Sequence, residues 1–149
     1  MRLFLSVVLT FLSLVGAASA QADDAKKDQD GLQGSWEVVE LVMDGKPAPE
    51  ATRKEIKIVF KGEKMTLTGP EGIGKREFSF KLDPSKKPKS IDFNPLEGQF
   101  KGKTSPAIYE LKRDELKLCM PNRGKERPTE FKAGEGSNLG LFVLKRSKK

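Results

Sequence analysis

The sequence predicts an all-β protein whose antiparallel strands form a barrel or a sandwich with at most one short helix. Short apolar segments recur along most of the chain, and several of them alternate apolar with polar residues at a period of two. Glycine and proline fall mostly between these segments, as expected for turns. A period of two is typical of strands with one buried face, and short connections favour antiparallel pairing.

The first three predicted strands cover residues 36–43, 56–61 and 65–67. The first strand ends at Asp44-Gly45, a dipeptide typical of tight turns. In the second strand, isoleucine and phenylalanine alternate with lysine and valine. Gly62-Glu63 then provides the short connection of a hairpin to the third strand.

Five further strands follow, and the sequence contains one short helical segment. The fourth predicted strand alternates phenylalanine and leucine with serine and lysine, and the fifth is short. The sixth and seventh are joined across Arg113-Asp114, and the last is apolar on both faces near its middle. Only residues 49–55, before the second strand, have a helical composition, for one or two turns. The five strands cover residues 78–82, 91–93, 107–111, 116–120 and 139–146.

Residues 1–20 have the three parts of a secretory signal peptide. Arg2 is the positive charge, residues 3–15 are apolar except for three small hydroxyl residues, and Ala18-Ser19-Ala20 is a small-residue cleavage site. The apolar run is shorter than the roughly 20 residues that span a bilayer. We therefore expect cleavage near Ala20, a secreted or periplasmic protein, and no transmembrane segment in the mature chain.

The mature chain is expected to begin with a flexible polar leader and to continue as a single domain. Residues 21–30 are polar and contain no large apolar side chain, which predicts the leader. The domain then covers residues 31–149, a length sufficient for one hydrophobic core without disulfides.

The composition excludes several kinds of catalytic and metal site. The 149-residue chain has no histidine and one cysteine, Cys119. This excludes a Ser-His-Asp triad, histidine-bound zinc, a thiolate metal cage and an internal disulfide. No carboxylate pair shows a spacing motif for general acid and base catalysis. We therefore expect no catalytic residue, metal or cofactor, and interpret Cys119 as a buried residue without chemistry.

The charge pattern argues against nucleic acid as a partner. The chain has 28 basic and 21 acidic residues, a net charge of +7, but the basic residues are spread along it. No basic stripe is interleaved with aromatic residues. Lys86, Lys87 and Lys89 form the strongest candidate for weak attraction to anionic polymers or lipid surfaces of the cell envelope.

Two motifs at opposite ends of the predicted sheet resemble the lipocalin signature. Gly34-Ser35-Trp36 opens the first predicted strand, and Arg146 closes the last. The resemblance implies an eight-stranded, up-and-down, lipocalin-like barrel in which the indole fills the closed end and the cation lies across it. It assigns Gly34, Trp36 and Arg146 to barrel closure through a cation–π contact.

A closer resemblance covers nearly the whole mature chain. Residues 32–39, with the sequence LQGSWEVV, are similar to the opening of a family of small secreted lipocalin-like domains found in planctomycete bacteria. That family has no established activity, so the resemblance implies a fold and a compartment rather than a ligand. The other matching stretches are residues 81–89, 91–93, 102–104, 108–111, 116–119, 127–131 and 144–146.

The barrel interior is the expected site of function. An eight-stranded barrel either holds one small ligand or is filled by its own side chains. We expect noncatalytic binding of a small apolar or amphipathic ligand by a monomer. The alternative is a filled barrel that contacts a protein or envelope partner through the loops at 84–90, 96–103 and 121–130. The candidate cavity residues are Val38, Phe60, Phe78, Phe80, Phe93, Tyr109, Leu118 and Phe142.

Overall fold

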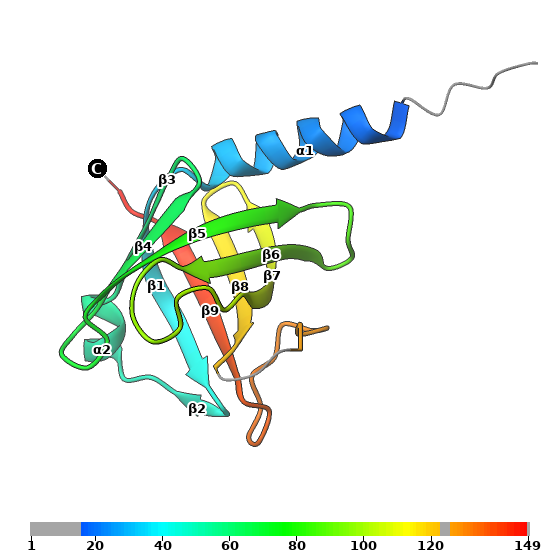
Figure 1. Cartoon of the computed structure of the whole chain (residues 1–149). Coiled ribbons are helices and arrows are strands. Elements are labelled where there is room, and N and C mark those ends of the chain that lie inside the picture. The colour runs from blue at the N-terminus through cyan, green and yellow to red at the C-terminus, as the bar shows by residue number, and fades with distance from the viewer. Residues whose placement is uncertain (1–15, 123–125, 149) are drawn as a thin grey trace, which may run out of the picture.

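The computed structural model describes residues 16–122 and 126–148, in which one antiparallel sheet curves round and closes on itself (Figure 1). Each strand pairs with its neighbour in the chain, and β1 pairs with β9 to close the barrel. The two-residue β2 lies beside β1 as an additional strand. The predicted eight-stranded, up-and-down barrel is therefore confirmed. The strands are β1 (Gly34–Met43), β2 (Lys46–Pro47), β3 (Lys57–Lys61), β4 (Lys64–Thr68), β5 (Lys75–Asp83), β6 (Lys89–Pro95), β7 (Ser105–Lys112), β8 (Glu115–Pro121) and β9 (Leu139–Arg146).

Two helices accompany the barrel in the described part of the chain. The short α2 (Glu50–Glu55) is the helix predicted at residues 49–55. The longer α1 (Gly16–Leu32) lies across one end of the barrel (Figure 1). Neither described helix is long and apolar enough to cross a bilayer. Residues 1–15 of the predicted signal peptide lie outside the described residues.

Helix α1 corrects the prediction of a flexible leader at residues 21–30, because these residues are helical. Its alanine, lysine and glutamine residues favour a helix, although no apolar face marks it in the sequence. Gln33, just after the helix, fixes its end to the β3–β4 turn. Its side-chain amide donates to the Gln29 and Gly62 carbonyls at 2.9 and 3.0 Å, and its side-chain oxygen accepts from the Gly62 amide at 2.7 Å. Tertiary contacts therefore order a segment whose composition is that of a leader.

The strand register places one continuous hydrophobic core inside the barrel. Side chains directly opposite on paired strands share a face. Trp36 lies opposite both Ile58 and Arg146, and Leu118 lies opposite both Tyr109 and Phe142. The buried core residues on the strands are Trp36, Val38, Leu41, Ile58, Phe60, Met65, Phe80, Ile91, Phe93, Ala107, Tyr109, Leu116, Leu118 and Leu144, and Leu32 and Ile56 join them.

A β-bulge in β1 keeps the inward face of this strand apolar. The register shifts between Val38 and Glu40, so that Val38 and Leu41 are both buried and Glu40 is exposed. The Arg53 side chain of α2 donates a hydrogen bond to the Val39 carbonyl within the bulge. The bulge therefore places the carboxylate in solvent and leaves the interior apolar.

The barrel has two different ends. The turns β3–β4, β5–β6 and β7–β8 lie with α1 at one end, which we call the closed end. The connections β4–β5, β6–β7 and β8–β9 lie at the other, which we call the open end, together with β2 and α2 (Figure 1). Trp36 belongs to the closed end because it is near the start of β1.

Candidate functional site

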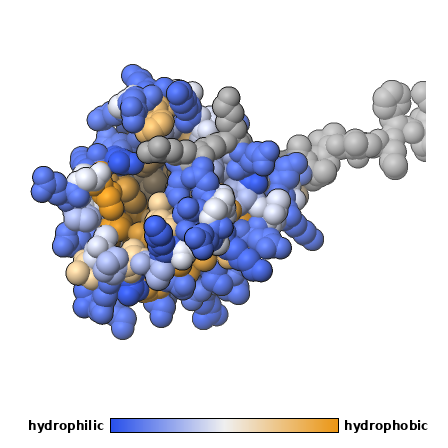
Figure 2. All heavy atoms as spheres, turned by 90° about the horizontal axis from the view of Figure 1, so that it is seen from below, coloured by the Kyte–Doolittle hydropathy of each residue, from blue (hydrophilic) through white to orange (hydrophobic). Residues whose placement is uncertain are grey.

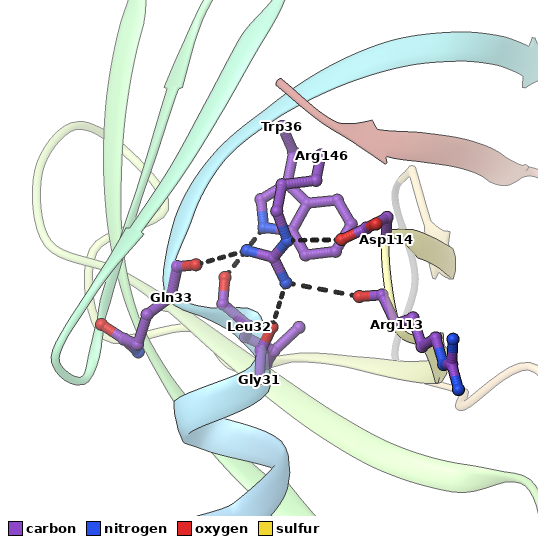
Figure 3. Close-up of polar contacts among 7 residues, drawn as sticks. All are labelled: Gly31, Leu32, Gln33, Trp36, Arg113, Asp114 and Arg146. Carbon is purple, nitrogen blue, oxygen red and sulfur yellow. Dashed lines mark hydrogen bonds and ion pairs between the residues drawn. The ribbon is translucent and has the colours of Figure 1, made fainter. Parts of the chain in front are cut away.

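The closed end is built around Trp36, whose side chain is fully buried. The Arg146 guanidinium lies over the indole, with its central carbon 4.4 Å from the ring centroid (Figure 3). The indole N–H donates to the Leu32 carbonyl at 2.8 Å. This arrangement combines a cation–π contact with a satisfied indole donor, as a buried tryptophan requires.

Arg146 also fixes the C-terminal end of α1 with its remaining donors (Figure 3). Its two terminal nitrogens donate at 2.7 Å to the carbonyls of Gln33 and Gly31. Its Nε donates to the Asp114 carboxylate at 3.0 Å, and Nη2 also reaches the Arg113 carbonyl at 3.3 Å. One guanidinium therefore joins β9, the β7–β8 turn and a helix end whose last carbonyls need donors.

Gly34 completes this arrangement. Its φ of +111° is a conformation that L side chains rarely adopt. A Cβ at this position would lie 3.4 Å from the nearer terminal nitrogen of Arg146. The structure thus brings together Gly34, Trp36 and Arg146, the residues predicted to close the barrel. Their contacts fill this end with protein atoms.

A second polar cluster lies at the closed end, and no motif in the sequence marks it. The Tyr109 hydroxyl donates to the Asp28 carboxylate at 2.7 Å, and the Lys89 ammonium donates to the same oxygen at 2.8 Å. Burial, followed by the bond to Asp28, raises the pKa of the Tyr109 phenol. Asp28 thus anchors α1 to β6 and β7, and its place in a polar segment gave no sign of this contact.

The predicted cavity residues divide into a packed group and a partly exposed group. Side chains of the packed group contact one another, as in the edge-to-face pair of Phe60 and Phe80, whose ring centroids are 5.3 Å apart. Only Phe78 and Phe142 are partly exposed. The part of the barrel nearer Trp36 is therefore filled by its own side chains. The packed group comprises Val38, Phe60, Phe80, Phe93, Tyr109 and Leu118, each at most 7% exposed.

The open end exposes part of the apolar interior. Leu67, Phe78, Met120 and Phe142 pack against the core but remain partly exposed, and we call these four residues the open-end cup. Gly140 lies opposite Met120, and a Cβ there would lie 2.9 Å from the Met43 sulfur, so other side chains already occupy the space beside this glycine. Figure 2, viewed from this end, shows a hollow with hydrophobic side chains in its depth and hydrophilic side chains around its rim.

Cys119 and the metal-ligating residue types form no site in the described residues. Cys119 is buried, faces away from the barrel interior and donates to the Lys132 carbonyl at 3.5 Å. Loss of solvent on burial raises the pKa of its thiol, so the reactive thiolate is disfavoured. No group of three or more Asp, Glu, Cys or His residues in the described ranges could hold a metal ion.

Comparisons with protein-family models, with curated proteins and with solved structures found no match. The likeness to secreted lipocalin-like domains therefore remains a prediction from the quoted stretches of sequence. The features that bear on function are the closed end, the filled interior and the open-end cup.

Proposed function

We propose that this protein binds a small apolar or amphipathic molecule in the open-end cup, as an exported binding protein that catalyses no reaction. The observation that carries the proposal is the difference in burial along the barrel axis. Most inward side chains near Trp36 are buried, with Leu82 and Leu111 partly exposed, whereas all four side chains of the cup are partly exposed at the end where Figure 2 shows a hollow. Concave apolar sites of this kind are typical of small-ligand binding at the mouths of β-barrels.

The driving force would be removal of apolar surface from water. Each Å² of apolar surface that ligand and cup bury together contributes about 25 cal/mol. Arg76 lies opposite Leu67 in the β4–β5 register and is exposed, so it supplies a cation beside the cup. An amphipathic ligand would place its apolar part against the cup and an acidic group near Arg76. The four cup side chains carry no acid, base or nucleophile, which supports binding without catalysis.

A charged substitution in the cup tests the proposal. N-phenyl-1-naphthylamine, a neutral fluorescent probe, should bind the unmodified protein with a gain in fluorescence. Met120→Arg places a cation in the cup without a need to bury it, because the long side chain reaches solvent. We expect this variant to weaken probe binding about tenfold or more, because a charge disfavours a neutral apolar ligand.

Val59→Arg is the matched control, because Val59 is 36% exposed and lies outside the core cluster. It introduces the same side chain on the outer face of β3 and should leave probe affinity unchanged. Equal affinities of both variants and the unmodified protein would contradict binding in the cup.

Native mass spectrometry addresses the natural ligand. The protein exported by its own host and purified without detergent should carry a discrete added mass that is lost on denaturation. The fragmentation pattern of that added mass would identify its chemical class. A protein that carries no added mass and does not bind the probe would contradict the proposal.

A second candidate function is contact with a protein or envelope partner through the loops. It is favoured by Phe100, which is 47% exposed in the connection between β6 and β7. The filled part of the interior fits this function equally well. Of the expected partner loops, 84–90 and 96–103 are described, whereas residues 123–125 of the third lie outside the described residues. Failure of the probe to bind would leave this as the better proposal.

A further inference from the structure

A second hollow lies on the outer wall of the barrel, separate from the open-end cup. Its volume is about 790 Å³, within the range of about 300–1,000 Å³ for small-molecule sites. Its borders are the middle of α1, the β5–β6 hairpin and residues 127–129. Helix α1, which the sequence analysis expected as a flexible leader, therefore forms one wall of a pocket.

The floor of this hollow contains Ser90, a residue whose backbone is buried in the barrel wall and whose hydroxyl is free to bind a ligand. Ser90 is 6% exposed and lies opposite Ile108, which is 1% exposed. Its neighbour Ile91 belongs to the core inside the barrel, so Ser90 faces the outer wall and lines the hollow. No described residue hydrogen-bonds to the Ser90 hydroxyl. A ligand oxygen in the hollow would therefore accept a hydrogen bond from this hydroxyl.

The charges around the hollow favour an anion. Four basic residues line it against two acidic ones, Asp83 and Asp92. The guanidinium of one of the four, Arg127, donates to Asp92 at 2.7 Å and to the Ala107 carbonyl at 2.8 Å. The hydroxyl and the backbone amide of Ser85 donate hydrogen bonds to the Asp83 carboxylate. These bonds lower the pKa of the Asp83 carboxyl, and the nearby cations of Lys86 and Arg127 lower it further. The three remaining cations, Lys81, Lys86 and Lys87, have no ion pair with any described residue.

The rest of the lining is small and apolar. Ala22 and Ala25 of α1 face the hollow, together with Pro84, Pro88 and Pro128. Alanine leaves space beside the helix, and the proline rings offer rigid apolar surface. The hollow thus has both cationic and apolar groups along its lining.

We propose that this outer-wall hollow binds a small, freely diffusing organic anion. Lys86 and Lys87 hold its phosphate or carboxylate group, the Ser90 hydroxyl donates to an oxygen of that group, and its apolar part packs against the alanines and prolines. The site is independent of the open-end cup and does not rest on the function proposed there.

Titration with phenyl phosphate, followed by NMR of the ¹⁵N-labelled protein, tests this site. We expect saturable shifts of the backbone amides of Ser90, Ile108 and Thr129, with little change at the cup. The double variant Lys86→Gln/Lys87→Gln should weaken binding about tenfold, because it removes two charge-assisted hydrogen bonds. The matched control Lys57→Gln/Lys61→Gln removes two exposed charges from β3 and should leave the affinity unchanged.

A second variant tests the hollow without a change of charge. Ala25→Trp places an indole in the space beside α1 and should abolish the saturable shifts. Circular dichroism of this variant would verify that the fold is retained. Binding of N-phenyl-1-naphthylamine at the cup should be unaffected by Lys86→Gln/Lys87→Gln, which distinguishes the two sites.

Three results would overturn the proposal. The first is the absence of saturable shifts at these amides with millimolar phenyl phosphate. The second is equal weakening by the Lys86→Gln/Lys87→Gln variant and its control, which would indicate nonspecific attraction to a basic protein. The third is binding only to phosphatidylglycerol vesicles or to an acidic peptide, because either would identify a surface for a larger partner.

Discussion

Trp36 packs at the closed end of the barrel and also contacts the end of a helix. Its ring is fully buried beneath Arg146, and its N–H bonds to the carbonyl of Leu32, the last residue of α1. Truncation of the ring therefore removes core packing, and loss of the N–H alone removes one buried hydrogen bond. These two contributions are separable by mutation.

We expect Trp36→Ala to lower the free energy of unfolding by about 3–5 kcal/mol, as for other buried large-to-small substitutions. Trp36→Phe keeps an aromatic ring under Arg146 and should cost less than Trp36→Ala, although it leaves the Leu32 carbonyl without its donor. Urea unfolding measures both values. Unchanged stability of Trp36→Ala would contradict the closing role.

At this scale, local sequence could predict Trp36 and Arg146 but not Asp28. The first two belong to a recognisable motif. The glycine of that motif, Gly34, is required because its backbone has a positive φ. Asp28 is one of several aspartates in a polar segment, and its partners Lys89 and Tyr109 are 61 and 81 residues away. Long-range pairing of this kind leaves no periodic signal in one sequence.

Among the elements, α1 depends most on a small number of anchors. Asp28 fixes it to the barrel wall, and Gln33 and Arg146 hold its C-terminal end. A helix with few apolar contacts owes its order to such polar contacts. Its opening should therefore be separable from unfolding of the barrel.

Asp28→Ala should raise the hydrogen-exchange rates of α1 amides and leave those of β7 and β8 nearly unchanged. The substitution removes the acceptor shared by Lys89 and Tyr109. Asp24→Ala is the control, because Asp24 is exposed on the same helix. Hydrogen exchange followed by mass spectrometry measures the difference. Equal protection of α1 in both variants would show that Asp28 is no anchor.

The strands were predictable and the helix was not, for a physical reason. Alternation in residues such as Ile58 and Phe60 directly reports one face buried in the core. In β1, the bulge after Val38 decides which way Glu40 faces, and a simple period of two contains no sign of it. Helix α1 has no apolar face, so no periodic pattern in the sequence predicts it, and its position depends on contacts with the folded barrel.

For the whole molecule, the sequence predicted a barrel but not how much of it is filled. The eight candidate cavity residues share the inner face, and six of them are buried whereas Phe78 and Phe142 are partly exposed. Whether side chains fill a barrel depends on summed volumes and strand stagger, which a pattern of apolar positions does not contain. The outer hollow likewise depends on where α1 lies.

The folded barrel also sets how stability responds to alkaline pH. Burial raises the pKa of both the Cys119 thiol and the Tyr109 phenol. In the unfolded chain these groups ionise near about pH 8.5 and 10. Above those values the unfolded state loses protons that the folded state keeps, so rising pH favours unfolding. Their contribution to stability is complete below about pH 8 and is lost as pH rises toward the folded-state pKa values.

We therefore expect the free energy of unfolding to fall above about pH 8.5, by up to about 1.4 kcal/mol per pH unit for each ionising group. Urea unfolding between pH 7 and 11 measures this dependence. Cys119→Ala should flatten the curve between about pH 8.5 and 10, and Tyr109→Phe should flatten it above about pH 10. Each variant changes only one of the two buried groups, so the differences between the curves isolate their contributions. Parallel curves for all three proteins would show that neither group is kept protonated by the fold.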